Sequence, residues 1–163
     1  MRNYEFFAKC VESETPAFLR VLRAVPGDQL HYRPHEKNTP AGALSWQMAR
    51  EMESLAALFV NGVIDYKSSD ENGSIAEAAD LFERSAKDVV ERARATNEDL
   101  WRGPAKFLYN GQAAWEAPAA DMAWGFLFDL IHHRGQLSVY LRLLNVPLPA
   151  MYGPSADEQP TFG

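Results

Sequence analysis

The sequence predicts an all-α protein built as a four-helix bundle. Four long segments carry apolar residues at the three- and four-residue spacing of an amphipathic helix. Clusters of proline and glycine separate these segments, and the chain of 163 residues is long enough to bury its own core. Four amphipathic helices in a chain of this size are typical of a bundle, so we expect one domain that spans residues 1–163.

The first two helices are expected at about residues 3–25 and 41–61. Pro16 interrupts the first segment, which predicts either a kink or a new helix that starts shortly before the proline. The second segment is rich in Ala, Met, Leu and Glu, all good helix formers. We expect Thr39 to cap it, with Pro40 at its first position.

The last two helices are expected at about residues 74–97 and 118–144. The segment Ser74-Ile75-Ala76-Glu77 has the pattern of a capping box, in which the serine and the glutamate each accept a backbone N–H. This pattern predicts that the third helix begins at Ser74. Asparagine and proline residues end the fourth helix.

Two shorter segments connect or follow the helices. An Asn-Gly pair flanked by aromatic and apolar residues predicts a small β-hairpin within residues 107–115. The turn-rich tail, residues 147–155, is expected to fasten helix ends; the alternative is that it closes over a pocket.

The charge and the cysteine content of the chain indicate which partners it lacks and in which compartment it is expected. Sixteen basic and 22 acidic residues give a net charge of −6, and no basic tract stands out, so we expect no nucleic-acid partner. The apolar runs are too short to span a bilayer, and we expect no membrane partner. A single cysteine excludes an internal disulfide and the start does not have the pattern of a signal peptide, so we expect a cytoplasmic protein.

Residues 128–137 place an acid, two histidines, an arginine and an amide in one helical segment. Because residues four apart share a helix face, Asp129 and His133 project together. A carboxylate and an imidazole one turn apart can supply two ligands of a metal ion. The alternative is a hydrogen-bonded Asp129–His133 pair, with Gln47 capping a buried polar cluster.

Four more residues are candidates for the pocket or its surroundings. His132 points about 100° away from its neighbour around the helix, which suits a residue that supports a ligand or lies at a subunit interface. Arg134 either holds an anion or braces Glu51, or it pairs with a nearby acid. Gln136 and Tyr140 either line the pocket mouth or hydrogen-bond across the bundle.

Several motifs of the chain resemble those of the DinB-like superfamily, and the resemblance covers most of the chain. The motifs are Tyr32-Arg33-Pro34-His35, Trp46-Gln47, His132-His133-Arg134-Gly135-Gln136-Leu137, Tyr140-Leu141-Arg142 and Tyr152-Gly153-Pro154-Ser155-Ala156-Asp157. The resemblance implies a four-helix bundle with a long crossover, often paired as a homodimer. It also implies a divalent metal, commonly zinc or nickel, held by one histidine of the second helix and two of the fourth. Some relatives use a low-molecular-weight thiol to transfer or isomerise substrates.

Only one of the three histidines of that pattern is present in this chain. His133 has the second ligand position of the fourth helix, Asp129 stands at the first, and Gln47 stands at the position in the second helix. Glu51 lies one turn after Gln47, so Gln47 and Glu51 are the candidates for the remaining ligands. Carboxylates in place of imidazoles favour manganese or iron(II), although zinc also accepts them. We expect a metal-dependent enzyme of transferase or hydrolase type that acts on a small molecule. The alternative is a non-catalytic binding or stress-response module with a metal-free pocket.

Overall fold

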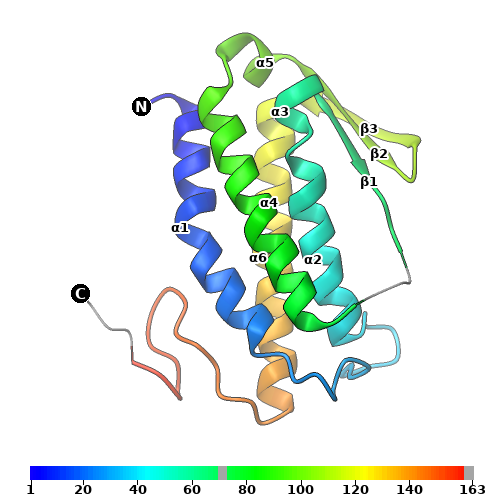
Figure 1. Ribbon diagram of the computed structural model, residues 1–163, viewed down its shortest axis with the longest axis vertical. Coiled ribbons are helices and arrows are strands. Elements are labelled where there is room, and N and C mark those ends of the chain that lie inside the picture. Colours follow the sequence, from blue (N-terminus) through cyan, green and yellow to red (C-terminus); the bar gives the residue numbers. More distant parts are fainter. Residues whose placement is uncertain (70–72, 160–163) are drawn as a thin grey trace.

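Four long helices run side by side along the molecule, with a small sheet beside them (Figure 1). The computed structural model describes residues 1–69 and 73–159. The long helices are α1 (Asn3–Arg23), α2 (Ala41–Leu55), α4 (Ile75–Ala95) and α6 (Ala119–Leu143). Their buried faces supply most of the hydrophobic core, so the predicted mainly helical architecture is confirmed.

Helix α1 continues through Pro16 without a break, so the expected second helix start is wrong. Proline removes one backbone N–H and leaves the carbonyl four residues earlier without its helical partner. Here that carbonyl belongs to Glu12, and both Glu12 and Pro16 are exposed, so water can satisfy it. Val11 and Phe18, on the opposite side of the helix, are buried in the core, so both halves of the helix are packed against it.

Helix α2 is shorter than predicted, and a separate short helix, α3 (Leu58–Asn61), follows it. Pro40 and not Thr39 occupies the N-cap position, so the expected threonine cap is wrong. The first two N–H groups of α2 donate to the carbonyl oxygens of Tyr32 and Leu30, both at 2.9 Å. Backbone carbonyl groups of the residues that precede α2 therefore take the place of a side-chain cap.

The connection from α2 to α4 runs along the outside of the helices through strand β1 (Val63–Tyr66), so α2 and α4 point in the same direction (Figure 1). Helix α4 begins with the predicted capping box: Ser74 Oγ accepts the N–H of Glu77, and the Glu77 carboxylate accepts the N–H of Ser74 at 2.7 Å. A short helix, α5 (Glu98–Arg102), then leads towards the hairpin.

The predicted hairpin is confirmed, but it belongs to a three-stranded sheet that corrects the all-α class. Strands β2 (Pro104–Tyr109) and β3 (Gln112–Pro118) are antiparallel, and β1 pairs with β2 in parallel. Asn110 and Gly111 have φ angles of 51° and 80°, which is the left-handed pair that a tight hairpin turn requires. Strand β1 escaped prediction because its partner lies about 40 residues later in the chain.

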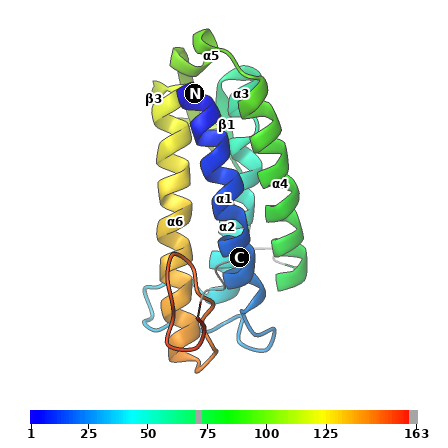
Figure 2. The same ribbon diagram turned by 90° about the vertical axis from the view of Figure 1, so that its left-hand side faces the viewer.

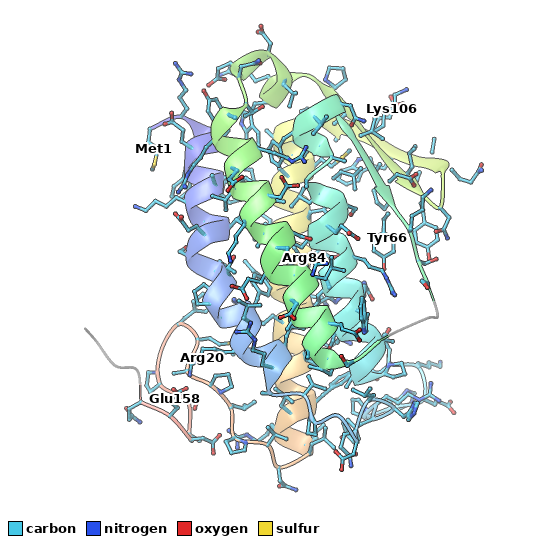
Figure 3. All side chains as sticks on the ribbon, viewed as in Figure 1. Met1, Arg20, Tyr66, Arg84, Lys106 and Glu158 are labelled. Carbon is cyan, nitrogen blue, oxygen red and sulfur yellow. The ribbon has the colours of Figure 1, made fainter. Side chains whose placement is uncertain are left out.

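The tail after α6 packs back against α1 and α6 (Figure 2). Arg20 of α1 donates to the carbonyl of Ala150 at 3.0 Å and also pairs with Glu158, which Figure 3 shows beside it. Arg142 of α6 pairs with Asp157 at 2.6 Å. The expected fastening role of the tail is confirmed. Within the described ranges, no helix is both long and apolar enough to cross a bilayer.

Candidate metal centre

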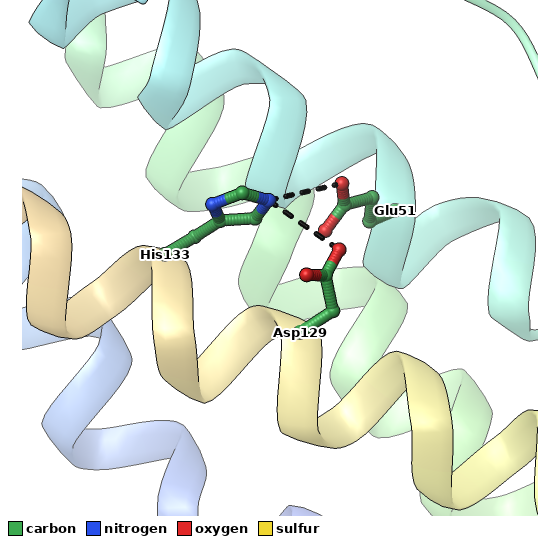
Figure 4. A group of neighbouring side chains, drawn as sticks. All are labelled: Glu51, Asp129 and His133. Carbon is green, nitrogen blue, oxygen red and sulfur yellow. Dashed lines mark ion pairs between the residues drawn. The ribbon is translucent and has the colours of Figure 1, made fainter. Parts of the chain in front are cut away.

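Helices α2 and α6 bring together the four residues that the sequence singled out for a metal. Gln47 and Glu51 lie one turn apart on α2, and Asp129 and His133 lie one turn apart on α6. The two helices pack against each other, and Figure 4 shows Glu51, Asp129 and His133 pointing towards one another between them. Gln47 Nε2 lies within hydrogen-bond distance of Glu51 and His133, so both pairs meet at this point. The i, i+4 spacing explains each pair, and the packing of the helices explains why the pairs meet.

Three of these side chains present ligand atoms to one another. His133 Nε2 lies 3.4 Å from Asp129 Oδ2 and 3.7 Å from Glu51 Oε1 (Figure 4). One ligand atom from each residue lies within 4.8 Å of the others. Ligands about 2.1 Å from a tetrahedral ion are about 3.4 Å apart, so small side-chain rotations would bring this set into range.

Glu51 is the buried member of the cluster. Its exposed fraction is 6%, and burial raises the pKa of its carboxyl group to about 7. The hydrogen bond from Gln47 to Oε1, at 2.8 Å, opposes that rise, whereas the charge of Asp129 adds to it. The other oxygen, Oε2, is buried and has no hydrogen-bond partner among the residues that the structure describes. A buried carboxylate oxygen without a partner is costly, and a cation would satisfy it.

His133 is held in the orientation that a metal ligand needs. Gln47 Nε2 lies 2.9 Å from His133 Nε2 and can only donate, so that ring nitrogen accepts and the proton sits on Nδ1. Nδ1 faces Gln136 Oε1 at 3.4 Å, and Gln136 Nε2 donates to the hydroxyl of Tyr140 at 2.9 Å. The lone pair of His133 Nε2 therefore points into the cluster.

The remaining candidates take different places. Gln136 and Tyr140 form a hydrogen-bonded chain with His133 within α6, whereas the two alternatives from the sequence were a place at the pocket mouth and a hydrogen bond across the bundle. His132 is exposed, and its ring lies 5.4 Å from that of His133. Arg134 pairs with the acid Glu14 rather than with Glu51, which is one of the alternatives that the sequence left open.

Arg134 instead joins α6 to α1 and to the tail. Its guanidinium is buried, pairs with Glu14 at 2.7 Å, and donates to the hydroxyl of Tyr152. It also lies over the ring of Phe18, 4.5 Å from the centroid. The 100° step between successive helical residues turns it away from the face that carries His133.

A cavity of about 440 Å³ opens beside the cluster, and the sequence analysis missed most of its walls. Gln47, Glu51 and Asp129 line it, together with Gly125 and with aromatic residues of the sheet and of α6. Tyr66 of β1 is one of them, and burial, together with the charge of Glu51, raises its pKa to about 12. The hairpin is predictable from its turn residues, but no local pattern marks β1, so the position of the sheet beside the cluster could not be predicted.

The known proteins that are similar to this chain align with most of its length. No family model matches the sequence. The uncharacterised protein YrdA of Bacillus subtilis (strain 168) is 21% identical over 168 residues, which covers 99% of this chain and 95% of YrdA. Among solved structures, the DinB-like protein YjoA of Bacillus subtilis superposes with a TM-score of 0.69 at 15% identity, over 89% of this chain and 96% of YjoA. A DinB-like protein of Bacillus cereus ATCC 10987 superposes with a TM-score of 0.71 at 15% identity, over 90% of this chain and 95% of its own.

Proposed function

We propose that this chain, which has the fold of the DinB-like proteins, holds a divalent metal between α2 and α6 and uses it in catalysis on a small molecule. The sequence motifs predicted that fold, and the two solved structures bear it out. The proposed ligands are Glu51, Asp129 and His133, with the side-chain oxygen of Gln47 as a fourth donor once its amide turns over.

The observation that carries the proposal is the unpartnered Oε2 atom of Glu51. It is buried within a set of two carboxylates and one imidazole, whose ligand atoms lie within 4.8 Å of one another. Two oxygen donors and one nitrogen donor suit manganese, iron(II), zinc or nickel. Asp129 has a side chain that is 56% exposed, so the set is open towards the cavity on that side.

The residues around the cluster have defined tasks in this proposal. Gln136 fixes the proton of His133 on Nδ1, which keeps Nε2 free to bind. Glu51 lies at the closed end of the cavity, and Asp129 lies at the open side. When bound, a metal there would supply Lewis acidity to a water or a low-molecular-weight thiol that attacks an electrophilic substrate. The proposed reaction is therefore of the transferase or hydrolase type.

A second function is favoured by the hydrogen bonds of Gln47. Its amide nitrogen contacts both Glu51 Oε1 and His133 Nε2, so most of the cluster is satisfied without an ion. A Glu51 with a pKa of about 7 is also partly uncharged at neutral pH, which lowers the cost of burying it. In this alternative the protein is a non-catalytic binding or stress-response module with a polar, metal-free pocket.

Metal content is the experiment that tests the proposal. Protein purified without an affinity tag should contain about one metal ion per chain by mass spectrometry. The His133→Ala variant should lose it, and His132→Ala, an exposed neighbour on the same helix, should keep it. Wild-type protein that is metal-free and refuses added zinc, manganese and nickel would rule the proposal out.

Two further variants separate the metal function from the polar-core alternative. Asp129→Asn and Gln47→Ala should lower metal content with a modest change in stability if the cluster binds metal. If the cluster is only a polar core, they should lower the free energy of unfolding and leave metal content unchanged. Chelation followed by a screen of thiols and electrophiles then tests catalysis.

Two expectations about architecture belong to the same proposal. We infer that the four long helices act as a four-helix bundle, with α3 and α5 as additions and the connection through β1 as its long crossover. The homodimer stays a prediction, which light scattering coupled to size-exclusion chromatography would test.

A further inference from the structure

The walls of the cavity beside the cluster are mostly aromatic. Sheet register places Tyr66 opposite Tyr109 and Phe107 opposite Trp115, so these four side chains come from paired positions of the three strands. Phe126 of α6 completes the set. Two cross-strand pairs and one helical residue thus form a wall that no single segment of the sequence contains.

The rings are packed against one another in fixed arrangements. Tyr66 and Tyr109 are stacked with centroids 5.9 Å apart, and Phe107 meets Phe126 edge to face at 5.4 Å. Trp115 and Tyr109 are 45% and 49% exposed, so they border the opening to solvent. A flat molecule in the cavity would lie against the faces and edges of these rings.

Gly125 provides space on the α6 side of the cavity. A Cβ atom built there would lie 3.8 Å from the nearest atom of the Trp115 ring, so any longer side chain would extend into the cavity. Gly125 lies one turn before Asp129, so the space it leaves adjoins the metal cluster.

The charged residues around the cavity disfavour ligands that are themselves anionic or cationic. Within the described parts of the chain, Glu51 and Asp129 are the charged residues that line the cavity, and no lysine, arginine or histidine lines it. An anionic group in the cavity would therefore find no basic partner, whether the two carboxylates are free or neutralised by a bound metal, and its desolvation would be uncompensated. A bound divalent metal would neutralise both carboxylates and remove any net attraction for a cation.

We infer that this cavity binds the substrate through an uncharged, planar aromatic group of about two rings, oriented so that its reacting atom faces Glu51 and Asp129. The inference rests on the proposed function, because a bound metal would neutralise the two carboxylates that line the cavity. The volume of about 440 Å³ falls in the usual range of small-molecule sites, about 300–1,000 Å³.

A matched pair of fluorescent probes tests the inference. N-phenyl-1-naphthylamine is uncharged, and 8-anilino-1-naphthalenesulfonate is the same two-part aromatic molecule with one sulfonate added. The neutral probe should bind the metal-loaded protein with a rise in fluorescence. The affinity for the sulfonate should be lower by about tenfold or more. Equal binding of the two probes, or no binding of the neutral one, would overturn the inference.

Variants locate the probe. Gly125→Leu fills the cavity and should weaken binding of the neutral probe about tenfold or more. Gly135→Leu, on the same helix where a Cβ meets open space, should not. Trp115→Ala removes a half-exposed wall and is expected to fold; it should also weaken binding, whereas Phe128→Ala, at an exposed position of α6, should not. Equal effects within either pair would place the probe elsewhere and overturn the inference.

Metal analysis of the same samples keeps the two proposals separate. Metal-loaded protein that does not bind the neutral probe would overturn the inference and leave the metal site intact. Protein that refuses metal yet binds the neutral probe, with loss in Gly125→Leu, would overturn the metal function and support the aromatic cavity.

Discussion

His133 and Arg134 are neighbours in α6, but their side chains point to different sides of the helix. His133 Nε2 faces Glu51 of α2, whereas the Arg134 guanidinium pairs with Glu14 of α1 at 2.7 Å. The first contact belongs to the candidate metal centre, and the second fastens α1 and the tail to α6. Substitutions at these two positions should therefore separate metal binding from stability.

Replacing Arg134 should destabilise the fold without affecting the metal. Arg134→Met leaves the Glu14 carboxylate with the Tyr152 hydroxyl but without its charged partner, so we expect a loss of about 3 kcal/mol in the free energy of unfolding. Urea denaturation measures the loss. By mass spectrometry, the metal content of the variant should equal that of the wild type. Arg142→Met, which breaks the more exposed pair with Asp157, should cost about 1 kcal/mol or less. Similar losses in both variants would contradict the special role of Arg134.

Burial of Glu51 should make the stability of the metal-free protein depend on pH. The pKa of its carboxyl group rises from the ordinary 4.5 to about 7 on folding, so between these values the folded protein holds a proton that the unfolded chain releases. Stability therefore falls as pH rises from about 4.5 to about 7, by up to about 3 kcal/mol. Urea denaturation in EDTA at several pH values should show this fall.

The Glu51→Gln variant should lose that dependence, because an amide has no proton to release. Glu53→Gln, at an exposed position of the same helix, is the matched control and should keep it. If Glu51→Gln retained the fall between pH 4.5 and 7, another group would be responsible.

Gln136 should tune metal affinity from outside the cluster. Gln136→Leu removes the acceptor that faces His133 Nδ1, so the ring is no longer held with Nε2 directed at Glu51 and Asp129. Losses of about 10- to 100-fold in affinity are typical when such a supporting contact is removed. Competition with a chromophoric zinc chelator would measure the change. Gln136→Glu keeps an acceptor and should bind zinc at least as well as the wild type; equal weakening in both variants would contradict the orienting role.

Replacing Gln47 with histidine should strengthen the site. The Gln47 amide already lies 2.9 Å from His133 Nε2 and 2.8 Å from Glu51 Oε1, so an imidazole there would reach the same centre. Imidazole nitrogen is a better zinc ligand than an amide oxygen, and the expected gain is about tenfold or more in zinc affinity. The same chelator competition measures it, with Gln47→Ala as the variant that should bind more weakly. Unchanged affinity in Gln47→His would show that this position lies outside the coordination sphere.

Local patterns in the sequence determined the long helices, the capping box at Ser74 and the turn at Asn110 and Gly111. Each depends on residues within one or two turns of one another, so periodicity and spacing are sufficient to predict it. The same reasoning put Asp129 and His133 on one face of a helix, whereas Gln47 and Glu51 were named as their partners through the resemblance to the DinB-like pattern, in which the second helix supplies a ligand. These predictions needed no knowledge of how the helices pack.

Only the tertiary structure decided the features that depend on contacts between distant segments. Strand β1 exists because it pairs with β2, and Pro16 stays within one helix because the core holds both sides of it. Arg134 turns to Glu14 because α1 and the tail lie on that side of α6. The aromatic cavity likewise combines three strands and α6. Such contacts join residues tens of positions apart, and no local pattern records which distant segment will meet which.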